Sequence, residues 1–156
     1  MTAPELRPVD LTVVDTNTAE WTLFPIPQIG VELDALPLIA DPDTGMQVFK
    51  MVYRAGFTNP WHHHPCAHGI YVLDGVLTTH GGEFGPGSFV WFPEGGIMEH
   101  GASADGDVTF LFITNKPFDI HYVERLSAES HPGEVVKANV MCPIRSRRTR
   151  FNHRHW

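Results

Sequence analysis

Three consecutive histidines stand in the segment W-H-H-H-P-C-A-H, which covers residues 61–68. Successive side chains of a β-strand alternate between its two faces, so His62 and His64 would point one way and His63 the other. Two imidazoles on one face of a sheet can bind a single metal ion. An exposed polar patch is the alternative for an isolated triplet, but the flanking glycines and the nearby His68 favour a metal site.

A second motif, G-P-G-S-F-V-W-F-P-E-G-G-I-M-E-H, runs from Gly85 to His100. Its glycines and prolines allow the chain to reverse on both sides of the apolar segment Ser88–Phe92, which reads as a strand. The turn after this strand can aim a following side chain inward. His100 is therefore the natural third metal ligand.

Together the two motifs resemble the paired motifs of the cupin superfamily, and the resemblance covers Met46–Thr114. In that family a small β-barrel receives two histidines and often a glutamate from the first motif, and one further histidine from the second. The resemblance implies that His62, His64 and His100 hold the metal. It places His68 where the common motif has its glutamate.

Two features depart from the common cupin pattern. The glutamate is absent, and His100 lies two residues after the usual position, which Met98 occupies here. Both features are similar to the three-histidine branch typified by acetylacetone (β-diketone) dioxygenase and 2,4'-dihydroxyacetophenone dioxygenase. This resemblance implies a non-haem Fe(II) dioxygenase that uses O2 to cleave a carbon-carbon bond in a small β-diketone or related enolisable ketone.

The charge of such a site supports this interpretation independently. Three neutral imidazoles leave the full +2 charge of a divalent metal uncompensated, whereas the common triad of two histidines and one carboxylate offsets part of it. An anionic bidentate ligand such as an enolate is therefore attracted. Imidazoles also suit zinc, nickel and copper, so the ligands do not dictate iron.

His68 has three roles open to it. It is either a fourth metal ligand, a hydrogen-bonding partner that orients another imidazole, or a lid residue. A closed site with four ligands would favour zinc and a structural role.

Two further residues are candidates for catalysis. His80 either donates a hydrogen bond that steers an anionic substrate or is a surface group at a hairpin end. Glu99 either accepts a hydrogen bond near the metal or faces away, because neighbours on a strand point in opposite directions. Apolar residues that either form a pocket wall or belong to the ordinary core are Phe49, Met51, Tyr71, Phe92, Met98, Phe110 and Phe112.

Composition predicts an all-β fold. The 156 residues are 42% hydrophobic, enough for one domain with its own core, and 14 glycines and 13 prolines suit short strands joined by turns. We expect a cupin barrel, a small jelly-roll-like structure, over residues 31–122. An irregular N-terminal arm would cover residues 1–30, and an extension with a short helix or tail would cover residues 123–156.

Strands and turns are predicted from apolar alternation and turn residues. The segment Met46–Ala55 should be a long strand, and Val108–Thr114 and Ser88–Phe92 should be core strands. Hairpins are expected at Asp74-Gly75 and at Gly81-Gly82. The other expected elements are strands at His62–His64, Gly69–Leu73 and Val76–Thr79, a turn at Asp41–Gly45 and a short helix at Tyr122–Glu129.

Cysteine content and hydropathy predict the compartment. The chain has two cysteines, Cys66 and Cys142, no signal-peptide pattern at its start, and no run of about 18 apolar residues that would span a membrane. We therefore expect a cytoplasmic protein that does not bind membranes. Cys66 lies beside the metal motif, but a buried small hydrophobic role is favoured over a redox or metal role.

The net charge of −7 argues against nucleic acid as a partner. The last residues are nevertheless basic, with arginines at 145, 147, 148, 150 and 154. This tail would dock on a neighbouring subunit or be disordered. Cupins of this kind usually form homodimers or homotetramers, so we expect a homo-oligomer. Outside the motifs, His121, His131, His153 and His155 are expected to be structural or surface residues.

Two other functions remain open. Another enzyme on the same barrel, such as a thiol dioxygenase, a lyase or an isomerase, is the first, because a fold does not fix its chemistry. A non-enzymatic zinc-binding module, like those of some metal-binding anti-sigma factors, is the second. Hydrolase, P-loop and dinucleotide functions lack their motifs in this sequence.

Overall fold

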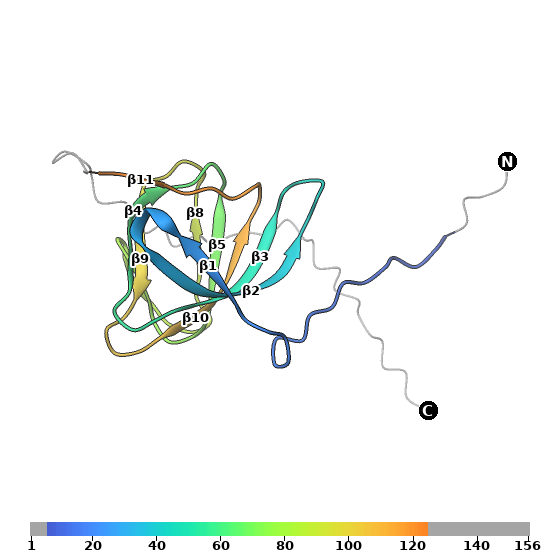
Figure 1. The fold of residues 1–156 in the computed structure, drawn as a ribbon, viewed down its shortest axis with the longest axis horizontal. Helices are drawn as coiled ribbons and strands as arrows, with labels where there is room; N and C mark the ends of the chain where they lie inside the picture. Colours follow the sequence, from blue (N-terminus) through green and yellow to red (C-terminus); the bar gives the residue numbers. More distant parts are fainter. Residues whose placement is uncertain (1–5, 125–156) are drawn as a thin grey trace, which may run out of the picture.

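The fold consists of two antiparallel β-sheets whose inner faces share one core (Figure 1). The computed structural model describes residues 6–124. In spatial order the larger sheet contains β1 (Thr22–Ile26), β2 (Val31–Ala40), β3 (Gln47–Tyr53), β10 (Val108–Thr114), β5 (His68–Asp74) and β8 (Phe89–Phe92). The smaller sheet contains β11 (His121–Tyr122), β4 (Thr58–His63), β9 (Met98–Ala102), β6 (Leu77–Thr79) and β7 (Gly82–Phe84). The all-β prediction is confirmed.

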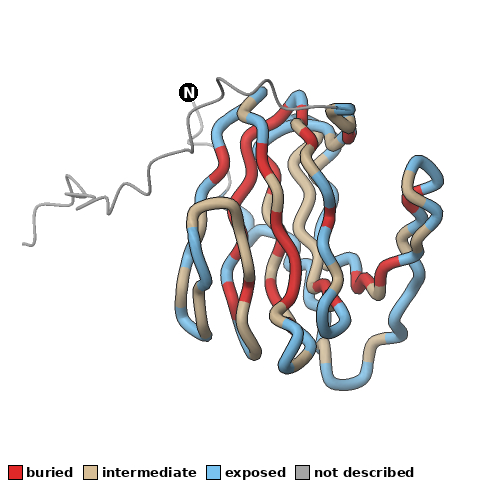
Figure 2. The backbone as a smooth tube through the Cα atoms, turned by 90° about the vertical axis from the view of Figure 1, so that its left-hand side faces the viewer, coloured by how far each residue is buried: buried red, intermediate tan, exposed pale blue. Residues whose placement is uncertain are grey.

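Strand β10 is the centre of the larger sheet and shows why these sequences form strands. Its residues alternate between buried and half-buried, and Val108, Phe110 and Phe112 point into the core. Burying each such side chain stabilises the fold by about 1.5–3 kcal/mol. Figure 2 shows the same alternation of buried and less buried positions along the strands. The predictions of β10 and of a long strand before it, β3, are both confirmed.

Strand β8 lies at the edge of the larger sheet and pairs only with β5 within the described residues. The aromatic residues of its outward face are therefore largely exposed, with Phe89 at 56% and Trp91 at 52%. The prediction that Ser88–Phe92 is a core strand is wrong in this respect. Its apolar sequence predicted burial on both faces, but only Phe92 is buried.

Two of the predicted turns join neighbouring strands. Between β2 and β3 the Asp41 carboxylate accepts hydrogen bonds from the Asp43 backbone N–H and the Thr44 hydroxyl, and Gly45 adopts a φ of 74°. Between β6 and β7 the Gly81-Gly82 hairpin pairs Thr79 with Gly82. Both predictions are confirmed.

The Asp74-Gly75 turn does not form a hairpin, so that prediction is wrong. It connects β5 of the larger sheet to β6 of the smaller sheet, and these two strands do not pair. Gly75 has a φ of 78°, and a Cβ there would lie 2.1 Å from the Asp107 carbonyl oxygen. A sharp turn with φ > 0 can therefore connect strands of two different sheets as well as the two strands of a hairpin.

The N-terminal segment is more regular than predicted. Strand β1 pairs with β2, so residues 22–26 are part of the larger sheet, and Ile26 enters the core at 3% exposure. A 3₁₀ turn at Pro27–Ile29 joins the two strands. The prolines of this segment led to the prediction of an irregular arm. Pro25 is nevertheless tolerated in β1, because this strand lies at the edge of the described sheet and has only one neighbouring strand there.

The C-terminal predictions fall largely outside the described residues. Tyr122, the first residue of the expected helix, lies in β11 and pairs with His62 of β4. Val123 and Glu124 are not helical either, so the predicted start of the helix is wrong. Residues 125–129 of that prediction lie outside the described residues, as do Cys142, His131, His153, His155 and the arginines at 145–154.

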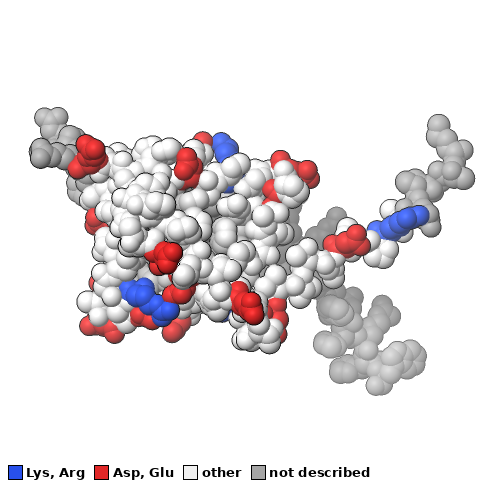
Figure 3. All heavy atoms as spheres, viewed as in Figure 1, with Lys and Arg blue, Asp and Glu red and all other residues white. Residues whose placement is uncertain are grey.

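Charged side chains are spread over the surface rather than gathered. In the view of Figure 3 acidic side chains are scattered and basic side chains form no patch. The lysines and arginines of the described part are Arg7, Lys50, Arg54 and Lys116. No helix among residues 6–124 is long and apolar enough to cross a membrane.

We predict that Gly75→Ala lowers the free energy of unfolding by about 2 kcal/mol or more, because the added Cβ meets backbone and the φ is positive. Gly106→Ala is the matched control, since a Cβ there has nothing within 4 Å. The control should change stability by about 0.5 kcal/mol or less. Urea unfolding measures the free energy of unfolding of both variants. Equal values for the two variants would contradict the tight backbone contact and positive φ at Gly75.

Candidate metal centre

His62 and His64 come from one strand and its immediate continuation. Strand β4 ends at His63, and both flanking histidines point inward, with 0% and 2% exposure. The ring of His63 lies on the other face, where it stacks on His121 at 5.2 Å. The alternation inferred from the sequence is thus observed.

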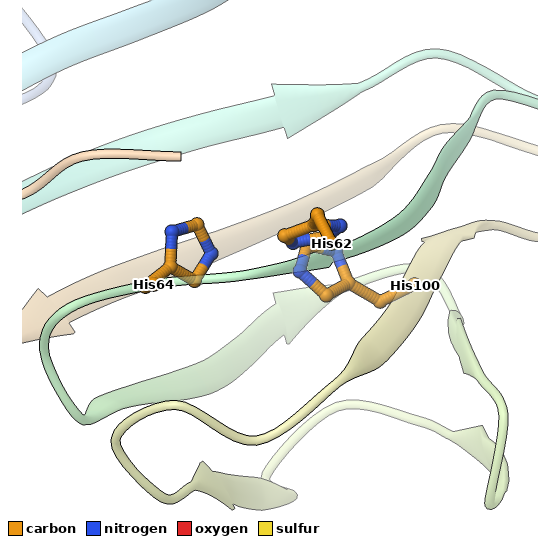
Figure 4. A group of neighbouring side chains, drawn as sticks. All are labelled: His62, His64 and His100. Carbon is orange, nitrogen blue, oxygen red and sulfur yellow. The ribbon is translucent and has the colours of Figure 1, made fainter. Parts of the chain in front are cut away.

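His100 reaches the same point from β9. Its pairing with β4 contains a bulge between Asn59 and His62, so that Asn59 lies opposite His100 and His62 opposite Met98. One potential ligand atom from each of His62, His64 and His100 lies within 4.8 Å of the others. Figure 4 shows the rings of His62 and His100 side by side, with His64 further along the segment that carries His62.

Hydrogen bonds fix the ring nitrogen that each histidine presents. Nδ1 of His62 lies 2.6 Å from the Pro60 carbonyl oxygen, and Nδ1 of His64 lies 2.6 Å from the Asp119 carbonyl oxygen. A carbonyl only accepts, so each Nδ1 carries the proton and donates it. In these neutral rings Nε2 is therefore left with a free lone pair.

His100 has a different partner at Nδ1, a hydroxyl that can either donate or accept. Its Nδ1 lies 3.3 Å from the Tyr53 hydroxyl, and its ring is stacked on Tyr53 with an interplanar angle of 10°. Its Nε2 has no hydrogen-bonding partner. Histidines that bind metals generally donate the other ring N–H to such a neighbour, which orients the ring.

Burial keeps these rings uncharged. It lowers the pKa of His62 to about 4 and that of His68 to about 2, and the nearby histidines add to both shifts. The pKa values of His64 and His100 fall below 6.5 for the same reason. At neutral pH the imidazoles are in the form that binds a metal ion.

The three residues fit a divalent metal. The Nε2 atoms of His62, His64 and His100 are buried and have no hydrogen-bonding partner among residues 6–124, although a buried polar atom left unpaired costs about 1–3 kcal/mol. One cation between them would satisfy all three. Imidazole nitrogens suit iron, zinc, copper and nickel, so the donor set fits several metals.

His68 lies next to this group but outside it. Its ring is 4.8 Å from His64 and stacks on Phe92 at 4.7 Å. Both of its ring nitrogens are buried and have no hydrogen-bonding partner in the part of the chain that the structure describes. Its role as a fourth ligand, an orienting partner or a lid residue stays a prediction.

An apolar cavity adjoins His64 and His100. Of the predicted wall, Phe49, Met51 and Phe112 line it. The remaining residues that line it are Phe24, Ile26, Leu33, Tyr53, Asn59, Phe118 and Ile120.

Four residues of the predicted wall do not line this cavity. Phe92, Met98 and Phe110 are buried in the core, and Tyr71 lies on the outer face of β5 with 38% exposure. Strand alternation indicated the face of each side chain correctly for the first three, but their position along the barrel depends on the pairing of the strands.

The two residues proposed for catalysis also lie away from the cavity. The ring of His80 packs on Trp61 at 5.5 Å, and its Nδ1 lies 3.4 Å from the Glu99 backbone nitrogen. Glu99 is half-buried between the inward-pointing Met98 and His100. Cys66, the free thiol beside the histidines, is fully buried, which raises its pKa.

Sequence comparison assigns the family. The profile of the ChrR cupin-like domain matches residues 9–119, which is most of the chain. The chain belongs to the ChrR cupin-like domain family. The expected membership of the cupin superfamily is thereby confirmed. No curated protein sequence matches this cupin domain.

Solved structures with the same fold serve different functions. A cupin-like protein from Ralstonia eutropha is 23% identical, with a TM-score of 0.58 and 70% of each chain covered. The polyketide cyclase RemF from Streptomyces resistomycificus is 24% identical, with a TM-score of 0.51, and the match covers 62% of this cupin domain and 73% of the cyclase. The anti-sigma factor ChrR of Rhodobacter sphaeroides, solved with SigE, is 17% identical, with a TM-score of 0.51 and coverages of 64% and 51%. These similarities show the fold alone.

We predict that His62→Ala and His100→Ala each remove the bound metal, because two remaining imidazoles hold a divalent ion weakly. His63→Ala is the matched control, since its ring lies on the opposite face. Metal per chain, measured by mass spectrometry after dialysis, should stay near wild type only in the control. Stoichiometric metal in both ligand variants would contradict the site.

We predict that acidification destabilises the metal-free protein between about pH 6.5 and about pH 4. In the unfolded chain His62 titrates near 6.5, but burial lowers its pKa to about 4 in the folded state. Between these values the unfolded chain binds protons that the folded chain does not. The free energy of unfolding therefore decreases as the pH is lowered. The loss is about 3 kcal/mol for His62 alone. Thermal melts across this range measure it.

His68→Leu tests the contribution of the fourth ring. The pKa of His68 is lowered to about 2, so it adds to the same loss and extends it to lower pH. Replacing the ring by an apolar side chain should make the stability of the metal-free protein less dependent on pH. If the stability of the metal-free variant depended on pH as strongly as that of wild type, His68 would not be buried in the folded state.

Proposed function

We propose that the protein is a metal-dependent dioxygenase that cleaves a carbon-carbon bond in a small β-diketone or a related enolisable ketone. In this proposal Fe(II) is held by Nε2 of His62, His64 and His100. The observation that carries it is the apolar cavity beside two of these three histidines, since a small organic ligand there would lie next to the metal.

The charge of the ligand set supports an enolate as the substrate form. All three rings are neutral, and the described residues bring no carboxylate into the group that could hold the metal. A bound divalent ion would keep its full charge and favour an anionic ligand with two oxygens. When bound, Fe(II) supplies the redox chemistry by which O2 reacts with the electron-rich carbon of such a ligand.

The lining of the cavity supports the polarity of the substrate. Its walls are mostly aromatic and aliphatic side chains, as is usual for small-molecule sites. The overall reaction is balanced without another reactant. A 1,3-diketone and O2 give one carboxylic acid and one 1,2-dicarbonyl compound, with both oxygen atoms retained in the products.

A zinc-binding module is the second candidate, favoured by two observations. The family takes its name from ChrR, which is an anti-sigma factor in the structure with SigE. His68 also has two unpartnered nitrogens close to His64, as a fourth ligand would require. A closed site with four ligands would bind zinc and leave no position for a substrate.

A homodimer or homotetramer remains part of the proposal, as does a cytoplasmic location. The exposed aromatic residues of β8, Phe89 and Trp91, support association of subunits, since large exposed apolar groups are favoured at interfaces.

We predict that the Fe(II)-loaded protein consumes O2 when acetylacetone is added, and that His100→Ala abolishes this uptake. His63→Ala is the control, because its ring lies on the other face of β4, where it stacks on His121, and it should leave both kcat and KM near wild type. An oxygen electrode measures the rates. Tightly held zinc with no uptake across diketones and thiols would overturn the dioxygenase proposal and favour the zinc module.

A further inference from the structure

The cavity beside the histidines has an opening that can be located from the exposure of its walls. Among the described residues that line it, Phe24, Phe49 and Phe118 are half-buried, and the others are buried. A side chain that contacts both the cavity and solvent lies where the cavity meets the surface. These three phenylalanines, the aromatic rim, therefore mark the mouth of the cavity.

The aromatic rim joins the edges of the two described sheets. Phe24 lies on β1 at one edge of the larger sheet, and Phe118 lies shortly before β11, at one edge of the smaller sheet. The ring centroid of Phe24 is 5.7 Å from that of Phe118 and 6.2 Å from that of Phe49, both in edge-to-face geometry. Because β1 and β11 belong to different sheets, side chains rather than a ladder of backbone hydrogen bonds close the mouth. Half-exposed side chains change rotamer rapidly, so a ligand can enter without separation of the sheets.

Phe118 connects this mouth to the metal centre. Its ring centroid lies 4.9 Å from that of His64. The next residue, Asp119, accepts the hydrogen bond from Nδ1 of His64 through its carbonyl oxygen, and Ile120 lines the cavity. Residues 118–120 thus supply part of the rim, the orientation of one metal ligand and part of the wall. A molecule that enters past Phe118 therefore comes next to the histidines.

We propose that the aromatic rim is the entrance through which a ligand reaches the metal, and that Phe24 and Phe118 restrict this ligand to a small size. The substrate class that fits is a 1,3-dicarbonyl compound with short alkyl ends, because a larger end group would have to displace the rings of the rim. The inference rests on the proposed function for this class of substrate. The entrance itself applies to any small molecule that binds the metal.

Rates of ligand association with the Fe(II)-loaded protein, measured by stopped-flow without O2, test the entrance apart from turnover. Two pairs of ligands are used. Acetylacetone and benzoylacetone share the dicarbonyl group, and imidazole and 4-phenylimidazole share the ring nitrogen that binds a metal. The members of each pair differ in size, because a phenyl group replaces a methyl group or a hydrogen.

Two variants widen the mouth. Phe118→Ala removes the ring beside His64, whereas Phe24→Ala removes a ring whose aromatic contacts among the described residues are with the other two members of the rim. Phe84→Ala is the matched control, because Phe84 is likewise half-buried but lies on β7, at the opposite edge of the smaller sheet from β11. Metal per chain is measured for every variant.

We predict that Phe24→Ala and Phe118→Ala each raise the association rate of the larger ligand relative to the smaller one. The increase should be about 10-fold or more, the scale on which an apolar pocket discriminates between ligands of different size. Phe84→Ala should match wild type for all of the ligands. If Phe118→Ala fails to fold or to hold metal, Phe24→Ala decides the test.

The possible outcomes separate the entrance from the proposed function. Unchanged ratios in Phe24→Ala would overturn the entrance, as would an equal increase in Phe84→Ala. If wild type binds the imidazoles but not the diketones, the proposed substrate class is wrong, and the imidazole pair decides the entrance by itself. If wild type holds metal but binds neither pair, both proposals are overturned, as expected for a closed site with four ligands.

Discussion

The burial of four imidazole rings between the two sheets is the constraint on which the rest of this structure depends. Within the described residues His62, His64 and His100 each have one nitrogen hydrogen-bonded and one nitrogen buried without a partner, and His68 has no partner on either nitrogen. Unpaired polar atoms oppose folding, and the surrounding apolar core must offset this cost. A single divalent cation at the Nε2 atoms would remove most of it, so metal binding and folding are expected to be coupled.

The two sheets contribute different parts of the site around these rings. The smaller sheet carries His62 and His100 on β4 and β9, while β3 of the larger sheet brings Phe49, Met51 and Tyr53 to the cavity. Backbone carbonyls of Pro60 and Asp119 hold two of the rings. The orientation of these two ligands therefore depends on backbone carbonyls, one in β4 and one just before β11, whereas the shape of the cavity depends largely on strand side chains.

The barrel itself does not decide between enzyme and binding module. Similar folds occur in a polyketide cyclase and in an anti-sigma factor, at identities that carry no functional argument. What separates the two candidates here is the site. An apolar cavity beside the histidines favours a small ligand, and the unpartnered nitrogens of His68 favour a fourth bond to metal.

Much of this protein was determined by its sequence alone. Strand periodicity and turn residues predicted the all-β fold, the long strands β3 and β10, and the common inward face of His62 and His64, because these depend on neighbours in sequence. The turn that follows Phe92 indicated His100 as the third ligand, and the resemblance of the two motifs supported it.

Only the tertiary structure decided the remaining features. The bulge in β4 turns Asn59 inward, whereas strict alternation from His62 would point it outward. The crossing at Gly75, the exposure of β8 and the position of His80 on Trp61 depend on which strands pair. Pairing is a contact between residues distant in sequence, and local patterns do not encode it. The hydrogen bond from Tyr122 to Asn59 and the contact of the Tyr53 hydroxyl with Nδ1 of His100 both arise from such contacts.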